Sequence, residues 1–270
     1  GFVFMRTGFE DENDIQLVAQ AIDSGAFHGQ ADQGEYVLNA YGTQFLTDMF
    51  SAYGQGDGGY TDNPDYAFQQ SGLGHNAVLV CNNDLSVCES SMYSHDPSPH
   101  KFLHHEQISS IPVAFSNGQY DRVTMDLTKA YQMNPEASSI TDAKRHIVFI
   151  REGGRKGYFV VIDDFSSSTA KRWQQRYHYG EYAKNTDVEP TIRSSNKFEL
   201  TKIGASSPKL FITHIAPTSG TTAAAKIRES VANPTGPNDN KWIQSITDSA
   251  SNRYVQVALL YPSENGVAPV

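Results

Sequence analysis

The sequence of 270 residues lacks long hydrophobic runs and has few basic residues. No apolar stretch approaches the ~18 residues that a membrane-spanning helix requires, so the sequence predicts no membrane span of that kind. The 21 lysines and arginines are outnumbered by 30 acidic residues, which gives a formal net charge of −9. Because phosphates attract basic surfaces, this charge argues against nucleic acid as the main partner.

Several motifs of catalysis are also missing. The sequence has no Gly-x-Ser-x-Gly, and no glycine-rich phosphate-binding loop precedes a helical segment. Asp163 and Asp164 suggest the paired carboxylates of glycoside hydrolysis. Adjacent residues of a strand point to opposite faces, however, so these two cannot both face one sugar. Serine hydrolysis, nucleotide binding and glycoside hydrolysis therefore have little support.

Cysteine is scarce, and the two that occur flank a turn-rich insert. Cys81 and Cys88 are separated by Asn82–Val87, and two strands on either side of such a turn would form a hairpin. A disulfide would then be reasonable and would fit a periplasmic or secreted protein. The alternative is two unrelated thiols in a reducing cytoplasm, and the sequence leaves both open.

Short β-rich runs and period-2 alternation dominate the chain. The many strands predict an all-β protein, a large antiparallel two-sheet β-sandwich. We expect a main part over residues 1–180, with 181–270 either completing the sandwich or forming a smaller second sheet. The first strand begins almost at once, so we expect the chain to be part of a longer protein. The predicted strands are 2–6, 14–21, 35–41, 44–50, 76–81, 108–115, 119–131, 145–152, 157–164, 171–179, 197–203, 209–215, 226–231, 241–246 and 253–261.

Two histidines stand in settings that favour a site. His28 lies in a glycine-rich turn that leads directly into an alternating strand, and Gly29 and Gly34 allow the backbone to approach a ligand closely. His75 is followed by Asn76 and opens a second apolar strand. The pattern indicates that His28 is presented to a ligand rather than packed in the core.

The same residues resemble the heparinase II/III-like polysaccharide lyases. That family has a His-x-His-Ala-Asp-x-Gly run entering a strand, an Asp at the end of the next strand, and a His-Asn before a further strand. The resemblance runs from about residue 2 to about residue 178, and one position departs from it, because Gln30 stands where the family has its second histidine. The matching residues are His28, Ala31, Asp32, Gly34, Asp48, His75 and Asn76.

The resemblance implies an enzyme that cleaves uronate-containing anionic polysaccharide by β-elimination. His28 would contact the substrate, either neutralising the uronate carboxylate or exchanging protons. The remaining catalytic groups of the family, a Tyr and an Asn or His, come from an N-terminal helical toroid domain that this chain lacks. The chain alone is therefore expected to be an incomplete lyase.

The resemblance also implies a metal site at Gln30, Asp48 and His75. Histidine and aspartate suit zinc, whereas a glutamine amide is a poor neutral ligand. Three outcomes remain open: a weakened zinc site, a harder ion such as calcium, or a hydrogen-bonded cluster with no metal. The role of such an ion would be structural, bracing the loop that carries His28.

Two further residues are candidates for substrate binding. His178 and Arg176 lie at the end of a strand with aromatic neighbours, and aromatic faces stack on pyranose rings. Basic residues also gather over 144–176, as either a local basic face or ordinary solvated charges. The rival function, favoured by Gln30, is a non-catalytic carbohydrate-binding or structural β-sandwich, and an adhesin-type or assembly domain is a third.

Overall fold

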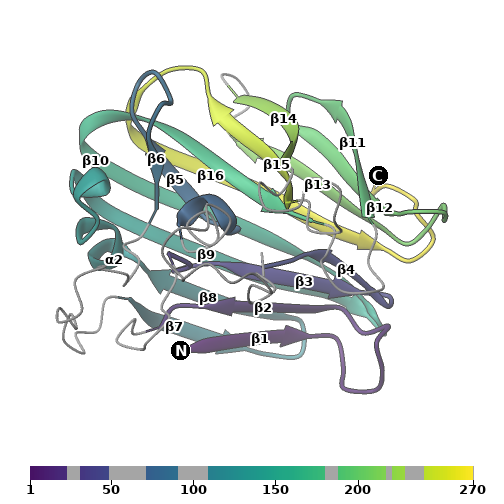
Figure 1. Cartoon of the computed structure of the whole chain (residues 1–270). Helices are drawn as coiled ribbons and strands as arrows, with labels where there is room; N and C mark the ends of the chain where they lie inside the picture. Colours follow the sequence, from purple (N-terminus) through teal and green to yellow (C-terminus); the bar gives the residue numbers. More distant parts are fainter. Residues whose placement is uncertain are drawn as a thin grey trace, which may run out of the picture.

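The computed structural model describes residues 1–22, 31–48, 71–90, 109–179, 188–216, 221–228 and 240–269. Antiparallel strands in two hydrogen-bonded sheets make up most of this part of the chain, which confirms the all-β sandwich (Figure 1). Among the described residues, no helix is long and apolar enough to cross a membrane.

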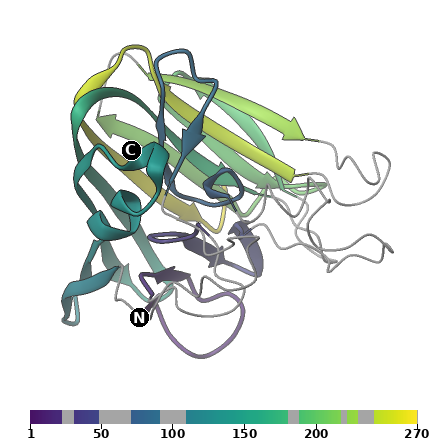
Figure 2. The same ribbon diagram turned by 60° about the vertical axis from the view of Figure 1, so that its left-hand side comes forward.

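The smaller sheet is a four-stranded meander with the order β1-β2-β3-β4. Its alternate residues, such as Leu17 and Leu38, are buried against the large sheet, and the sheet covers one face of it near β8 and β9 (Figures 1 and 2). The tight connection between its last two strands uses positive φ at Tyr41 and Gly42. The strands are β1 (Phe2–Arg6), β2 (Gln16–Gln20), β3 (Tyr36–Ala40) and β4 (Thr43–Leu46).

The larger sheet contains twelve strands, eight of them in the order β11-β12-β13-β16-β10-β9-β8-β7. The other four are attached at the far end of β10, where β5 and β15 pair with it. Its strands are β5 (Val78–Cys81), β6 (Cys88–Glu89), β7 (Ser110–Ser116), β8 (Tyr120–Asp126), β9 (Ile140–Gly153), β10 (Lys156–His178), β11 (Val188–Ser194), β12 (Lys197–Lys202), β13 (Lys209–Ala216), β14 (Thr221–Arg228), β15 (Asn240–Thr247) and β16 (Ser251–Ser263).

One long strand, β10, connects two parts of the twelve-stranded sheet. Its first half pairs with β9 and β16, and its second half pairs with β5 and β15. The register with β16 shifts between Ser166 and Lys171, just before β10 begins to pair with β5 at Arg172. The sequence predicted two strands here, 157–164 and 171–179, because the polar serines between them resemble a turn.

The core is formed by residues of both sheets and is rich in aromatic side chains. Trp173 of β10 stacks on Tyr254 of β16 with ring centroids 5.5 Å apart, and Tyr177 meets Phe198 of β12 edge-on at 5.3 Å. Burying one large apolar side chain contributes roughly 1.5–3 kcal/mol. These contacts hold the second half of β10, which borders the candidate site, against the rest of the sandwich.

The predicted strand over 119–131 is wrong in its second half. Strand β8 ends at Asp126, and a short helix, α2 (Thr128–Gln132), follows it. The Asp126 carboxylate accepts a hydrogen bond from the Thr128 backbone N–H at 3.1 Å, which satisfies a free donor at the start of the helix. Leu127, Ala130 and Tyr131 are buried, a helical spacing that the sequence analysis interpreted as part of a strand.

Of the two alternatives for the cysteines, the structure shows the disulfide. Cys81 and Cys88 form a disulfide across the β5–β6 hairpin. Two single-turn helices, η1 (Gly72–Gly74) and η2 (Pro135–Ala137), complete the described elements, and the strand β11 was not predicted. The division of the chain near residue 180 stays a prediction.

Candidate functional site

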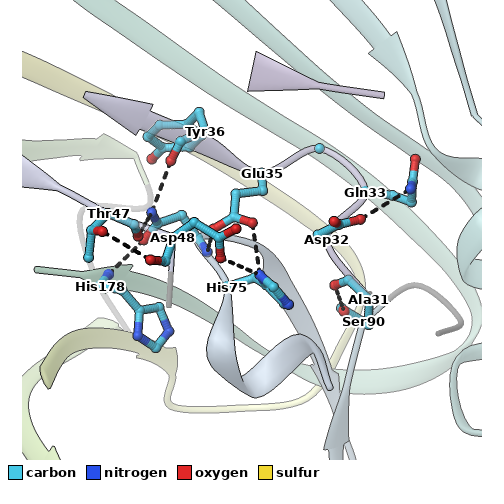
Figure 3. Close-up of polar contacts among 12 residues, drawn as sticks. Ala31, Asp32, Gln33, Glu35, Tyr36, Thr47, Asp48, His75, Ser90 and His178 are labelled. Carbon is cyan, nitrogen blue, oxygen red and sulfur yellow. Dashed lines mark hydrogen bonds and ion pairs between the residues drawn. The ribbon is translucent and has the colours of Figure 1, made fainter. Parts of the chain in front are cut away.

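Three segments far apart in sequence bring a carboxylate, a second carboxylate and an imidazole together. Glu35 stands just before β3, Asp48 follows β4, and His75 follows helix η1. The Nδ1 atom of His75 lies 2.8 Å from Oε2 of Glu35 and 3.0 Å from Oδ1 of Asp48 (Figure 3). His75 and Glu35 are fully or almost fully buried, whereas the Asp48 side chain is 39% exposed. The group therefore reaches the surface only at Asp48.

The turn before β3 points Glu35 into the molecule. Gly34 has a φ of +82°, and its N–H donates to the Gln20 carbonyl at 2.9 Å, which joins the turn to β2. A Cβ at residue 34 would lie 2.4 Å from a methyl carbon of Leu127. Only glycine satisfies both the backbone conformation and this close packing.

Asn76 is fully buried and connects every segment of the group. Its backbone N–H donates to Oε1 of Glu35 at 3.2 Å, and its side-chain amide donates to the carbonyls of Tyr36 and Thr47 at 2.9 and 2.8 Å. Its side-chain oxygen accepts from the backbone N–H of His178 at 2.6 Å. The position of Asn76 thus fixes the segments on both sides of the His75 ring.

The buried carboxylates have unusual pKa values. Burial, reinforced by the charge of Asp48, raises the pKa of Glu35 to about 8. Burial likewise raises the pKa of the neighbouring Asp32 to about 6. For His75, burial alone would lower the pKa, but the charges of Glu35 and Asp48 outweigh it and raise the pKa well above its ordinary value. Folding therefore places carboxyl groups whose charged forms are disfavoured beside an imidazole whose charged form is favoured.

The group fits a divalent cation. The three donor atoms, one each from Glu35, Asp48 and His75, lie within 4.8 Å of one another. A proton on Nδ1 of His75 can form hydrogen bonds to the Glu35 and Asp48 oxygens at the same time. A divalent cation would neutralise the charges of both carboxylates. One imidazole nitrogen and two carboxylate oxygens form a donor set that zinc accepts.

The structure brings together part of the site that the sequence predicted. Asp48 and His75 meet, with Nδ1 of His75 3.0 Å from Oδ1 of Asp48, and their role as metal ligands stays a prediction. His28 and Gln30 lie outside the described residues, so their positions stay predictions. Glu35 was not predicted as part of the site, because glutamate is rarely buried unless it is paired, and its partners come from distant segments of the chain.

His178 and Arg176 lie on one face of the second half of β10. Arg176 packs its guanidinium over the ring of Trp242 at 4.7 Å and donates to the Leu73 carbonyl at 2.6 Å. The His178 ring lies 5.8 Å from that of Trp242. Both residues are buried and adjoin the segment that carries His75, and their part in substrate binding stays a prediction.

The basic residues of segment 144–176 do not form one face. Arg145 is buried beside Asp163, whereas Lys144 points outward and pairs with Asp142. Arg151 pairs with Asp121 at the far end of β9. Alternation along β9 separates Lys144 from Arg145, and Arg151 lies six residues farther along the strand than Arg145. Their acidic partners offset all three charges.

No family model and no curated protein matches the chain, but solved structures do. All of the chain aligns with 36% of heparan sulfate lyase HepC from Pedobacter heparinus, with a TM-score of 0.69 and 18% identity. A mutant of that lyase gives a TM-score of 0.71 at 18% identity. A heparinase III structure gives a TM-score of 0.66 at 12% identity, with 99% of this chain and 36% of that chain covered.

These likenesses define the class of fold. The chain is a β-sandwich of the kind found in the heparinase-type polysaccharide lyases, as the sequence resemblance predicted. It spans little more than a third of the length of the lyases that it matches.

Proposed function

We propose that the chain is the β-sandwich part of a polysaccharide lyase acting on uronate-containing anionic polysaccharide. The observation that supports this proposal most is the likeness of the whole chain to heparan sulfate lyase HepC and heparinase III, joined to the buried acid–imidazole group of Glu35, Asp48 and His75. A helical toroid domain of the same protein would supply the remaining catalytic groups.

The proposed reaction is a β-elimination. A base removes the C5 proton of the uronate, the C4–O bond breaks, and a C4–C5 double bond forms. The departing C4 oxygen receives a proton from an acid. Because the C5 proton is weakly acidic, the uronate carboxylate must be neutralised by hydrogen-bond donors before the proton is lost, and we assign His28 to the substrate for this purpose or for proton exchange.

We also propose a structural divalent cation at Glu35, Asp48 and His75, and zinc in preference to calcium because one donor is an imidazole nitrogen. Gln30 was the expected third ligand, and Glu35 is a better one because a carboxyl group, unlike an amide, can ionise when a cation binds. The ion would brace the start of β3 and the segment leading into it.

The disulfide between Cys81 and Cys88 supports a periplasmic or secreted location, because such bonds persist in oxidising compartments.

The lyase proposal is tested by ultraviolet absorbance of the unsaturated uronate product. The longest natural polypeptide containing this chain is incubated with heparan sulfate, chondroitin, hyaluronan, alginate and ulvan, beside a His28→Ala variant. We expect absorbance to grow with one polymer and to be lost in the variant. A folded protein that is silent on all five polymers would contradict the lyase proposal and favour the carbohydrate-binding alternative.

The metal proposal is tested by metal content and thermal unfolding of the same polypeptide. We expect bound zinc by elemental analysis, and a lower Tm after chelation that returns with zinc, since an ion present at a hundredfold excess over its Kd stabilises by ~2.7 kcal/mol. Asp48→Asn should lose this response, whereas Glu189→Gln on the exposed surface should keep it. Equal responses in both variants would rule out the site.

A further inference from the structure

Arg145 is a buried arginine with more hydrogen bonds than its ion pair needs. It lies on β9, is 1% exposed, and meets Asp163 of β10 through two bonds, Nε to Oδ1 at 2.6 Å and Nη2 to Oδ2 at 3.0 Å. Its Nη2 also donates to the side-chain oxygen of Gln175 at 2.8 Å. These contacts satisfy one side of the guanidinium within the β9–β10 ladder.

The other amino group of Arg145 bonds the backbone beside the acid–imidazole group. Nη1 donates to the carbonyl of Gly34 at 2.6 Å and to the carbonyl of Asn76 at 2.8 Å. Gly34 immediately precedes Glu35, and Asn76 immediately follows His75. One nitrogen therefore connects the two segments whose side chains meet.

Asn76 extends this connection to the third member of the group. Its backbone N–H donates to Glu35, and its side-chain amide donates to the carbonyl of Thr47, the residue before Asp48. Arg145 thus acts on all three side chains through Gly34 and Asn76, without a hydrogen bond to any of the three in the described structure.

A comparison with an apolar pair in the same place identifies what Arg145 contributes to the site. An apolar pair of similar volume in place of a buried arginine and aspartate is often as stable as the ion pair or more so. Such a pair, however, has no donor for the buried carbonyls of Gly34 and Asn76. The special contribution of Arg145 is therefore the alignment of these carbonyls.

We propose that Arg145 is the positioning residue of the site: it holds Glu35, Asp48 and His75 in register by bonding the carbonyls of Gly34 and Asn76. Its importance for turnover rests on the proposed lyase function, whereas its effect on the His75 ring does not. Loss of residues that orient a site through its ligands typically costs 10–100-fold in affinity or activity.

The test compares Arg145→Lys with Arg151→Lys. Arg151 is a matched control on the same strand, since it pairs with Asp121 and donates to the carbonyls of Arg6 and Asn117, far from the site. The first readout is the ring ¹⁵N and ¹H signals of His75, assigned among the nine histidines with a His75→Gln variant. The second is turnover by the longest natural polypeptide.

We expect Arg145→Lys to keep the β-sheet circular dichroism, to shift or broaden the His75 ring signals, and to lower turnover 10–100-fold. Arg151→Lys should change neither readout. The proposal is overturned if folded Arg145→Lys protein keeps both wild-type values, or if the two variants change alike.

A second variant covers the case in which a lysine at 145 prevents folding. The double change Arg145→Met and Asp163→Leu removes both charges together, which buried pairs tolerate better than the loss of one partner. If this variant folds with unchanged His75 signals, the proposal fails. It also fails if neither variant folds, because Arg145 is then a folding residue. If the wild-type polypeptide has no lyase activity, the His75 signals still decide the positioning role.

Discussion

At the scale of single residues, Gly34 shows how one backbone conformation sets up the site. Its φ is +82°, and an added Cβ would lie 2.4 Å from Leu127. We expect Gly34→Ala to cost ~1–2 kcal/mol for the left-handed backbone and a further ~1–3 kcal/mol for the clash. Urea unfolding measures the sum.

Gly153 provides the matched control for that prediction. It has a φ of +92° at the β9–β10 turn, with nothing within 4 Å of an added Cβ. Gly153→Ala should therefore cost only the backbone contribution. Equal losses in the two variants would show that Leu127 moves aside.

A second prediction at this scale concerns His214, which is buried in the core. The ring of His214 lies among Tyr177, Ser245 and Gln256, with Nε2 2.9 Å from the Tyr177 hydroxyl. Burial lowers the pKa of His214 to about 4. The His214 imidazole takes up a proton near pH 6.5 in the unfolded chain but only near pH 4 in the folded chain. The contribution of neutral His214 to the free energy of unfolding is therefore full above pH 6.5 and is lost as the pH falls toward 4.

The size of this effect follows from the pKa difference, at ~3 kcal/mol between pH 6.5 and 4. The measurement is urea unfolding of wild type and His214→Gln across this range, where the difference in slope isolates His214 from other titrating groups. Parallel pH profiles would show that the folded protein protonates His214 as readily as the unfolded chain does.

At the scale of elements, the β5–β6 hairpin depends on its disulfide. Cys81 and Cys88 close a short loop, and β6 contains only two residues, so few ladder bonds hold it. We expect Cys81→Ala with Cys88→Ala to lower the free energy of unfolding by ~2–3 kcal/mol.

Reduction provides the control for the hairpin. Dithiothreitol should destabilise the wild-type protein by a similar amount and should leave the double variant unchanged. A wild-type urea midpoint that ignores the reductant would show that the loop is held by its other contacts, among them the Asn82 side chain bonded to Ser86 and Val87.

At the scale of the whole molecule, the chain covers 36% of the heparan sulfate lyase that it resembles. The proposed elimination needs groups from a second domain, so we expect the isolated 270-residue chain to form no unsaturated product while the longest natural polypeptide does. Ultraviolet absorbance with the preferred polymer measures both. Turnover by the isolated chain would mean that it contains a complete catalytic set.

The sequence by itself determined the all-β class, most strand positions and part of the site. Alternate residues such as Tyr36 and Leu38 predict a strand because period 2 is a local property of the backbone. Asp48 and His75 were predicted from the resemblance to the heparinase II/III-like family, and the structure places Nδ1 of His75 3.0 Å from Oδ1 of Asp48. Helix α2 was missed because Leu127, Ala130 and Tyr131 fit helix and strand almost equally well over so short a segment.

Only the tertiary structure decided what surrounds these residues. Glu35 meets His75 across 40 positions of sequence, and Arg145 bonds Gly34 and Asn76 across 111 and 69 positions. No local pattern records such pairs, because they depend on how two sheets twist and pack. Burial then converts ordinary carboxylates into groups with raised pKa values, since desolvation of a charge exists only once the chain has folded.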